Sequence, residues 1–203
     1  MGFFKNLFSS SKEVWQQFAN EIGGEYIDSG FWKSKKVVAK LENWIIVLDT
    51  FTTSSGKHST TYTRIRAPFK TLDGLKFNIN RKGVFNSIGK AIGIQDIETG
   101  HINFDEEFVI KGNDEDKIRG IFSIKEIRDA IRNQDRISLK IKDDEGLFST
   151  NLSEGNYELY FQSTGVIKDI DRLKNLFMIF YLILNALHLV DSASKDEVDI
   201  KLK

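Results

Sequence analysis

The chain has 203 residues, 40% of them hydrophobic and 12% aromatic, and its 29 basic and 29 acidic residues cancel. This length predicts a single domain over residues 1–203, and 16 Phe are enough for an aromatic-rich core. There is no Cys, which excludes disulfides and thiolate metal sites, and the zero net charge argues against a general nucleic-acid binder.

The first predicted element is a helix over residues 11–22. Ser10 and Glu13 match a capping box, in which each side chain accepts a hydrogen bond from the other residue's backbone N–H. Apolar residues then recur at helical spacing, and Gly23 and Gly24 end the pattern.

Residues 25–163 are predicted to be rich in strands, with short helical insertions. Lys35–Leu41 and Trp44–Phe51 flank a two-residue turn and predict a hairpin, whose second strand is apolar enough to be buried on both faces. Thr52–Thr63 is expected to be a polar loop, and the next strand, Tyr62–Phe69, should break at Pro68.

Alternating and helical patterns continue through the middle of the chain. Ser123 and Glu126 match a second capping box, ahead of a helix whose apolar face ends at Ile131. A further helix is expected at 84–92, and further strands at Leu75–Asn80, Phe104–Ile110, Ile137–Ile141 and Tyr157–Phe161.

A long apolar helix is predicted over residues 169–190. Residues 176–184 are apolar on every side. At ~1.5 Å per residue they span only ~13 Å, too short for the ~30 Å core of a bilayer. The helix is therefore expected to be buried by a sheet, by a second subunit or by both, and the polar tail 191–203 is expected to be frayed. The predicted fold class is α+β: a mostly antiparallel, curved sheet packed on this C-terminal helix, with short helices on the rim.

No pattern in the chain predicts a reaction. His58, His101 and His188 are the three histidines, and none belongs to a recognised ligand or catalytic motif. Asp96, Glu98 and Glu107 fit positions 1, 3 and 12 of a calcium loop, but His101 stands where that loop needs glycine. No metal site, cofactor or catalytic residue is therefore predicted.

Two short segments are candidates for contact with a partner or a membrane surface. The first lies ahead of the first helix, and the second places a Trp among lysines, a composition that suits an anionic surface. A charged strand edge that resists aggregation is the favoured explanation of the second. The candidate contact residues are Phe3, Phe4, Leu7, Phe8, Trp32, Lys33, Lys35 and Lys36.

Charge is distributed unevenly along the chain. Residues 1–90 hold 14 Lys and Arg against 7 Asp and Glu, and residues 91–203 hold 15 against 22. Two halves of one fold can lie together and compensate each other, or the first half can form a basic face that meets an anionic surface.

A short motif resembles a known family. Gly100–Phe108 reads G-x-x-x-F-D-x-x-F, and Tyr62-Thr-Arg64 precedes it. This combination is similar to a family of uncharacterised prokaryotic proteins, a domain of unknown function in which the motif is expected on a strand. The resemblance implies a single α+β domain and carries over no activity.

These features favour a non-enzymatic binding or scaffold module in the cytoplasm, peripheral to the inner face of the membrane where it docks there. Its expected partner is a protein, a second copy of the chain that meets the C-terminal helix, or a membrane surface. The alternatives are a hydrolase or transferase that uses His58 or His101, and weak nucleic-acid binding by the basic first half.

Overall fold

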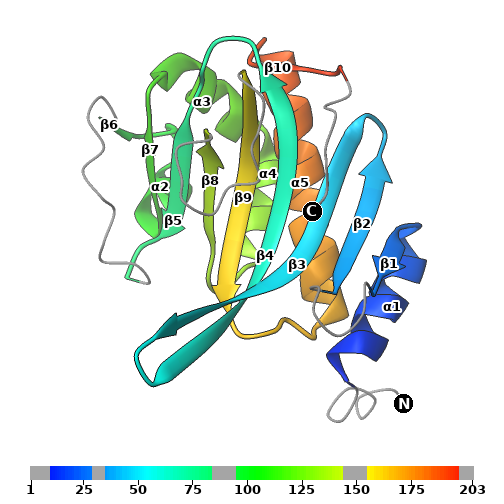
Figure 1. Cartoon of the computed structure of the whole chain (residues 1–203). Coiled ribbons are helices and arrows are strands. Elements are labelled where there is room, and N and C mark those ends of the chain that lie inside the picture. Colours follow the sequence, from blue (N-terminus) through cyan, green and yellow to red (C-terminus); the bar gives the residue numbers. More distant parts are fainter. Residues whose placement is uncertain (1–9, 29–34, 84–94, 144–154, 197–203) are drawn as a thin grey trace, which may run out of the picture.

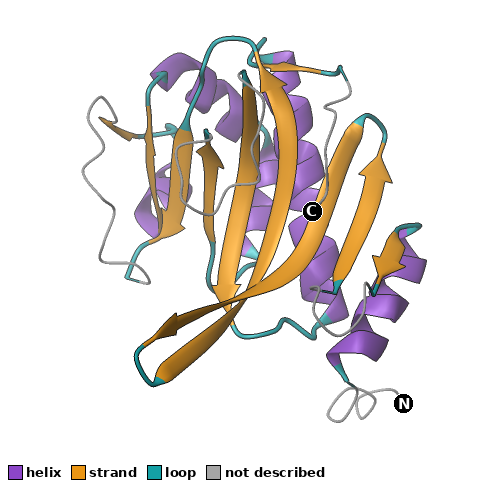
Figure 2. Cartoon of the chain, viewed as in Figure 1, coloured by secondary structure: helices purple, strands orange, loops and turns teal. Residues whose placement is uncertain are grey.

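The structure is a computed structural model that describes residues 10–28, 35–83, 95–143 and 155–196. Over these residues ten strands form one curved antiparallel sheet, with the helices gathered mainly on one of its faces (Figures 1 and 2). The strand order is β1-β2-β3-β4-β9-β8-β5-β7-β6, and β10 pairs with β4. The predicted α+β class is confirmed.

The helices are α1 (Ser11–Ile22), α2 (Ile102–Glu107), α3 (Glu115–Ser123), α4 (Lys125–Arg132) and α5 (Ile170–Leu189). The strands are β1 (Glu25–Ile27), β2 (Lys36–Leu41), β3 (Trp44–Ser55), β4 (His58–Thr71), β5 (Phe77–Arg81), β6 (Gln95–Ile97), β7 (Phe108–Gly112), β8 (Ser138–Lys142), β9 (Asn156–Thr164) and β10 (Ala193–Ser194).

Helix α1 confirms the first capping box. The backbone N–H of Glu13 donates to the Ser10 hydroxyl at 3.3 Å, and the backbone N–H of Ser10 donates to the Glu13 carboxylate at 3.0 Å. Gly23 then ends the helix in the left-handed conformation, at φ 68°, where glycine is favoured.

Strands β3 and β4 form a longer hairpin than expected. The segment predicted as a polar loop is strand on both sides of a turn at Gly56, because its β-branched threonines suit a pleated ribbon. Facing hydroxyls of Thr52 and Thr61 lie 3.0 Å apart across the pair. The predicted break at Pro68 is also wrong. Pro68 lies past the last residue that pairs with β3, at an edge position where a missing N–H is tolerated.

Two local predictions in the middle of the chain are wrong. Phe104 lies in α2 rather than in a strand, and β7 begins only at Phe108. The Asp105 carboxylate folds this segment by accepting hydrogen bonds from the backbone N–H of Thr99 and the Thr99 hydroxyl. The second capping box does not form, because Ser123 still belongs to α3 and its hydroxyl donates to the Gly120 carbonyl at 2.7 Å.

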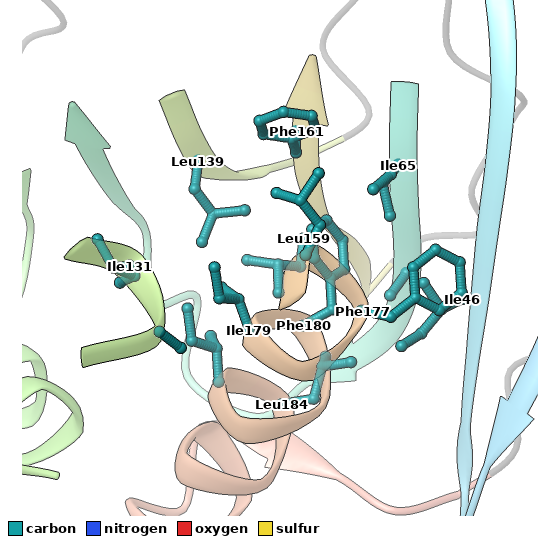
Figure 3. Packing of buried hydrophobic residues seen from close by; sticks show 14 of the residues in the cluster. Ile46, Ile65, Ile131, Leu139, Leu159, Phe161, Phe177, Ile179, Phe180 and Leu184 are labelled. Carbon is teal, nitrogen blue, oxygen red and sulfur yellow. The ribbon is translucent and has the colours of Figure 1, made fainter. Parts of the chain in front are cut away.

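Helix α5 lies against the concave face of the sheet and organises the core. Phe180 and Leu184 are fully buried and face apolar residues of the strands (Figure 3). Phe177 meets Phe18 of α1 edge-on, with ring centroids 4.9 Å apart. The predicted apolar C-terminal helix is therefore confirmed, and within the described residues the sheet and the neighbouring helices bury most of it.

The chain after α5 is only partly as expected. Ser192 and Ala193 are fully buried, and β10 pairs with the end of β4, so the tail is ordered at least to residue 194.

Strand β7 ends at Gly112, where a Cβ would lie 2.8 Å from the Lys76 carbonyl oxygen and would overlap the side chain of Ile118. Only glycine lets α3 approach the sheet this closely. The helix predicted at 84–92 lies outside the described residues.

Candidate functional site

The two faces of the sheet differ sharply in chemistry. Along β4, Ile65 and Ala67 point to the helices and are fully buried, while Arg64 and Arg66 point to the opposite face. That second face, here called the charged face, carries no helix among the described residues (Figure 1). It is the surface on which polar side chains from distant parts of the chain meet.

Strand pairing brings these side chains together. Across β4, β9 and β8, Arg66 lies beside Tyr160, and Tyr160 lies beside Lys140. Residues directly opposite on paired strands share a face of the sheet. The resulting charged cluster consists of Asp49, Arg64, Arg66, Lys140, Lys142, Glu158 and Tyr160.

Asp49 holds one side of the cluster. Asp49 is 2% exposed, and its carboxylate accepts two hydrogen bonds from Arg64, at 2.7 Å from Nε and 2.8 Å from Nη2. It accepts a third from Nη2 of Arg66 at 2.7 Å. The Arg66 side chain is only 11% exposed, and its buried Nε has no hydrogen-bond partner in the described part of the chain. The arginines are thus fixed in place, but Arg66 is incompletely satisfied.

The ring of Tyr160 lies on the other side of the charged cluster, beneath two lysines. Its ring is almost fully buried, and its hydroxyl donates to Oε1 of Gln162 at 2.8 Å. The ammonium group of Lys142 lies 3.2 Å from the ring centroid, and that of Lys140 lies 5.7 Å from it. Both amines therefore lie close to the same aromatic ring, to which cations are attracted. Glu158, which is nearly buried, lies opposite Lys142 on β9.

Burial shifts the proton affinity of these groups. It is the main reason that the pKa of Lys142 falls to about 8, and the positive charge of Lys140 lowers it further. Burial also raises the pKa of Tyr160 to about 12 and raises the pKa of Glu158. For Arg64, burial acts to lower the pKa, but the hydrogen bonds and charge of Asp49 outweigh it and raise the value. Such shifts concentrate at functional sites.

An apolar groove of about 610 Å³ lies elsewhere on the molecule. It lies where the end of α1 and the turn between β2 and β3 meet the outer side of α5. Met178 is exposed there, and the hydroxyl of Tyr181 donates to Glu42 at 2.8 Å on the rim. Self-association through α5, predicted from the sequence, would use this side of the helix and stays a prediction.

The predicted contact residues divide into two groups. Phe3, Phe4, Leu7, Phe8, Trp32 and Lys33 lie outside the described residues. Lys35 is exposed just before β2, and Lys36 pairs with Asp49 and so shares its face of the sheet. Of the predicted contact residues, the structure brings Lys36 to the border of the charged cluster. Membrane docking through the other residues stays a prediction.

The three histidines lie far apart in the fold. His58 is exposed at the far end of the β3–β4 hairpin, and His101 precedes α2. His188 lies in the last turn of α5, with Nδ1 3.1 Å from the Ala193 carbonyl oxygen. Within the described residues, no hydrogen bond or ion pair joins any of their imidazoles to a Ser or a carboxylate, and no group of His, Asp or Glu is arranged to hold a metal ion.

The fold and the cluster define an α+β protein with a curved, non-closed antiparallel sheet, covered by helices on one face and charged on the other. In this fold it is similar to the crystal structure of the mycobacterial trehalose monomycolate transport factor A, TtfA, with a TM-score of 0.55 and 10% sequence identity. The similarity covers 91% of this chain and 98% of that one. No protein-family model matches the sequence, and no match to a curated protein was found.

One further finding concerns membranes. No helix in the described ranges is long and apolar enough to cross a bilayer.

Proposed function

We propose that this protein is a non-enzymatic binding module that holds an anionic ligand on its charged face. The observation that carries the proposal is the charge balance of the charged cluster. Two arginines and two lysines face two carboxylates there, and several of these groups are largely out of water. Excess charge of one sign is costly in such a place, and an anion bound there would offset it.

The depth of the cluster favours a small anionic group over a broad flat surface. Arg66 and Arg64 are only 11% and 18% exposed, so their guanidinium groups do not protrude. A ligand must reach them with a compact charged group. The similarity to a protein named as a transport factor supports a role in binding and carrying rather than in conversion.

Calorimetric titration with small anions tests this proposal. The full chain is titrated at low ionic strength with inorganic phosphate, sulfate, citrate and acetate. The same titrations use the double variant Lys140→Met, Lys142→Met. Loss of one charge-assisted hydrogen bond costs about 1.5–3 kcal/mol, so the double variant should bind at least about tenfold more weakly.

Lys57→Met is the matched control. Lys57 is exposed at the turn of the β3–β4 hairpin, so this variant removes a positive charge away from the charged cluster. It should bind like the unmodified chain. Absence of binding for all four anions, or equal binding by the double variant, would refute the proposal.

A further inference from the structure

We infer that the ligand presents a terminal phosphate dianion, held over the ring of Tyr160 between Lys140, Lys142 and Arg66. This inference rests on the proposed function and specifies the chemistry of the same site. It is carried by three cationic side chains gathered around Tyr160. Lys140 and Lys142 of β8 lie over its ring, and Arg66 of β4 lies directly opposite Tyr160 on the paired strand.

The charge of the cluster matches a dianion. Arg64, Arg66, Lys140 and Lys142 face Asp49 and Glu158, which leaves an excess of two positive charges when all are ionised. A phosphate monoester carries about −1.5 to −2 charges at pH 7 and has three acceptor oxygens. A single carboxylate would neutralise only half of that excess.

The donors also suit phosphate. Arg66 uses Nη2 to bind Asp49, and among the described residues its buried Nε has no partner, so a modest rotation of the guanidinium can present a second donor. A planar guanidinium recognises phosphate with two parallel hydrogen bonds, and an ammonium group acts as a point charge beside it. Lys142 and Lys140 supply two such charges above Tyr160.

Ligand binding should be accompanied by proton uptake. The groups that face Lys142 are Lys140 on β8, Glu158 and Tyr160 on β9, and Arg64 and Arg66 on β4. Since burial and the nearby cations hold the pKa of Lys142 at about 8, roughly half of the free protein carries a neutral amine at pH 8. A dianion beside this amine favours its charged form, so the complex should gain up to about half a proton at that pH.

The experiment is calorimetry of the full chain with glycerol 3-phosphate at pH 8, in Tris and in HEPES, whose ionisation enthalpies differ. Proton uptake makes the observed heat depend on the buffer. The unmodified chain and Lys57→Met should both bind glycerol 3-phosphate, with an uptake of at most about half a proton. Lactate, a monoanion, should bind at least about tenfold more weakly, because it lacks the second charge.

Lys142→Arg separates charge from protonation. Arginine keeps the positive charge but does not lose its proton in proteins, so this variant should still bind while its buffer-dependent heat falls. Glu158 also gains proton affinity beside an anion, and Glu158→Gln removes that contribution. Uptake should persist in Glu158→Gln and be lost in Glu158→Gln combined with Lys142→Arg.

The outcomes distinguish this inference from the proposed function. Binding of several anions without preference for phosphate esters, or binding without proton uptake, would overturn the inference and leave the binding module in place. No binding of any anion would overturn both. A second arm uses vesicles of phosphatidylcholine with one fifth phosphatidic acid. Sedimentation with these vesicles that glycerol 3-phosphate competes away assigns the phosphate to a lipid headgroup, and binding of glycerol 3-phosphate alone assigns it to a soluble ester.

Discussion

Replacing Asp49 by Ala should destabilise the protein more than any other single charge removal on the sheet. The carboxylate is nearly inaccessible and accepts three hydrogen bonds of 2.7–2.8 Å from Arg64 and Arg66. Its loss leaves two poorly hydrated guanidinium groups without their counterion. Breaking a buried pair in this way costs about 3–5 kcal/mol. For a chain of this size, that corresponds to a fall of about 6–20 °C in the melting temperature.

Denaturant unfolding followed by circular dichroism measures the loss. Asp96→Ala is the matched control: its side chain is 74% exposed and forms an ion pair with Lys111 at 3.1 Å on the same sheet. An exposed pair contributes only about 0–1 kcal/mol. A loss for Asp49→Ala no greater than that of Asp96→Ala would refute the electrostatic account of the cluster.

A triple variant identifies why Asp49→Ala loses stability. If the cost of Asp49→Ala comes from uncompensated charge, then adding Arg64→Met and Arg66→Met should restore a large part of the stability, since well-packed apolar replacements of a buried ion cluster are often neutral or stabilising. If the cost came only from lost packing, the triple variant would be less stable than Asp49→Ala.

Three further predictions concern the core, the backbone and pH. Phe180→Ala, which empties a fully buried site on α5, should cost about 3–5 kcal/mol in denaturant unfolding, whereas Met178→Ala on the exposed side should change stability by less than about 1 kcal/mol. Gly112→Ala should destabilise because its methyl group meets backbone, while Gly120→Ala, inside α3 with its nearest neighbour at 3.4 Å, should be neutral or stabilising by up to about 1 kcal/mol. A higher melting temperature for Gly112→Ala, or a lower one for Gly120→Ala, would contradict this. The pKa of Lys142 falls from 10.5 to about 8 on folding, so between these pH values the unfolded chain binds more protons than the folded one. The free energy of unfolding should therefore rise from pH 8 to pH 9.5, and Lys142→Met should remove that rise. The same pH dependence in Lys142→Met as in the unmodified chain would count against this prediction.

The sequence predicts local structure best where a side chain acts within a few residues. The capping box at Ser10 forms as its spacing predicts. The same spacing at Ser123 fails, because the preceding helix α3 runs through Ser123 and uses its hydroxyl internally. Phe104 has strand-like neighbours, but Asp105 fastens that segment to Thr99 and turns it into a helix. In the two failures a competing local hydrogen bond, absent from the pattern, decides the outcome.

The candidate site was beyond prediction for a different reason. Arg66, Tyr160 and Lys140 meet because β4 pairs with β9 and β9 pairs with β8. The first of these pairings joins strands about half the chain apart. Sequence periodicity does show that Arg64 and Arg66 share a face of one strand, but it does not give the partner strand or the register. The role of Asp49 could not be predicted either. It follows an apolar run that predicts burial, and nothing in that run indicates that it pairs with two arginines.

Stability alone does not account for the charged cluster. The opposite face already supplies a continuous apolar core against α5, and apolar side chains on the charged face would be easier to accommodate than desolvated lysines. The low pKa of Lys142 shows that its charged form is disfavoured in the free protein, which is a cost to folding near neutral pH. Lys142 costs stability, and it lies beside other cations and over the ring of Tyr160. A ligand that favours the charged form of Lys142 explains this arrangement better than stability does. The variant that gains stability by losing Lys142 should therefore be the one that loses the anion, and this coupling of opposite effects is what separates a binding site from a structural ion cluster.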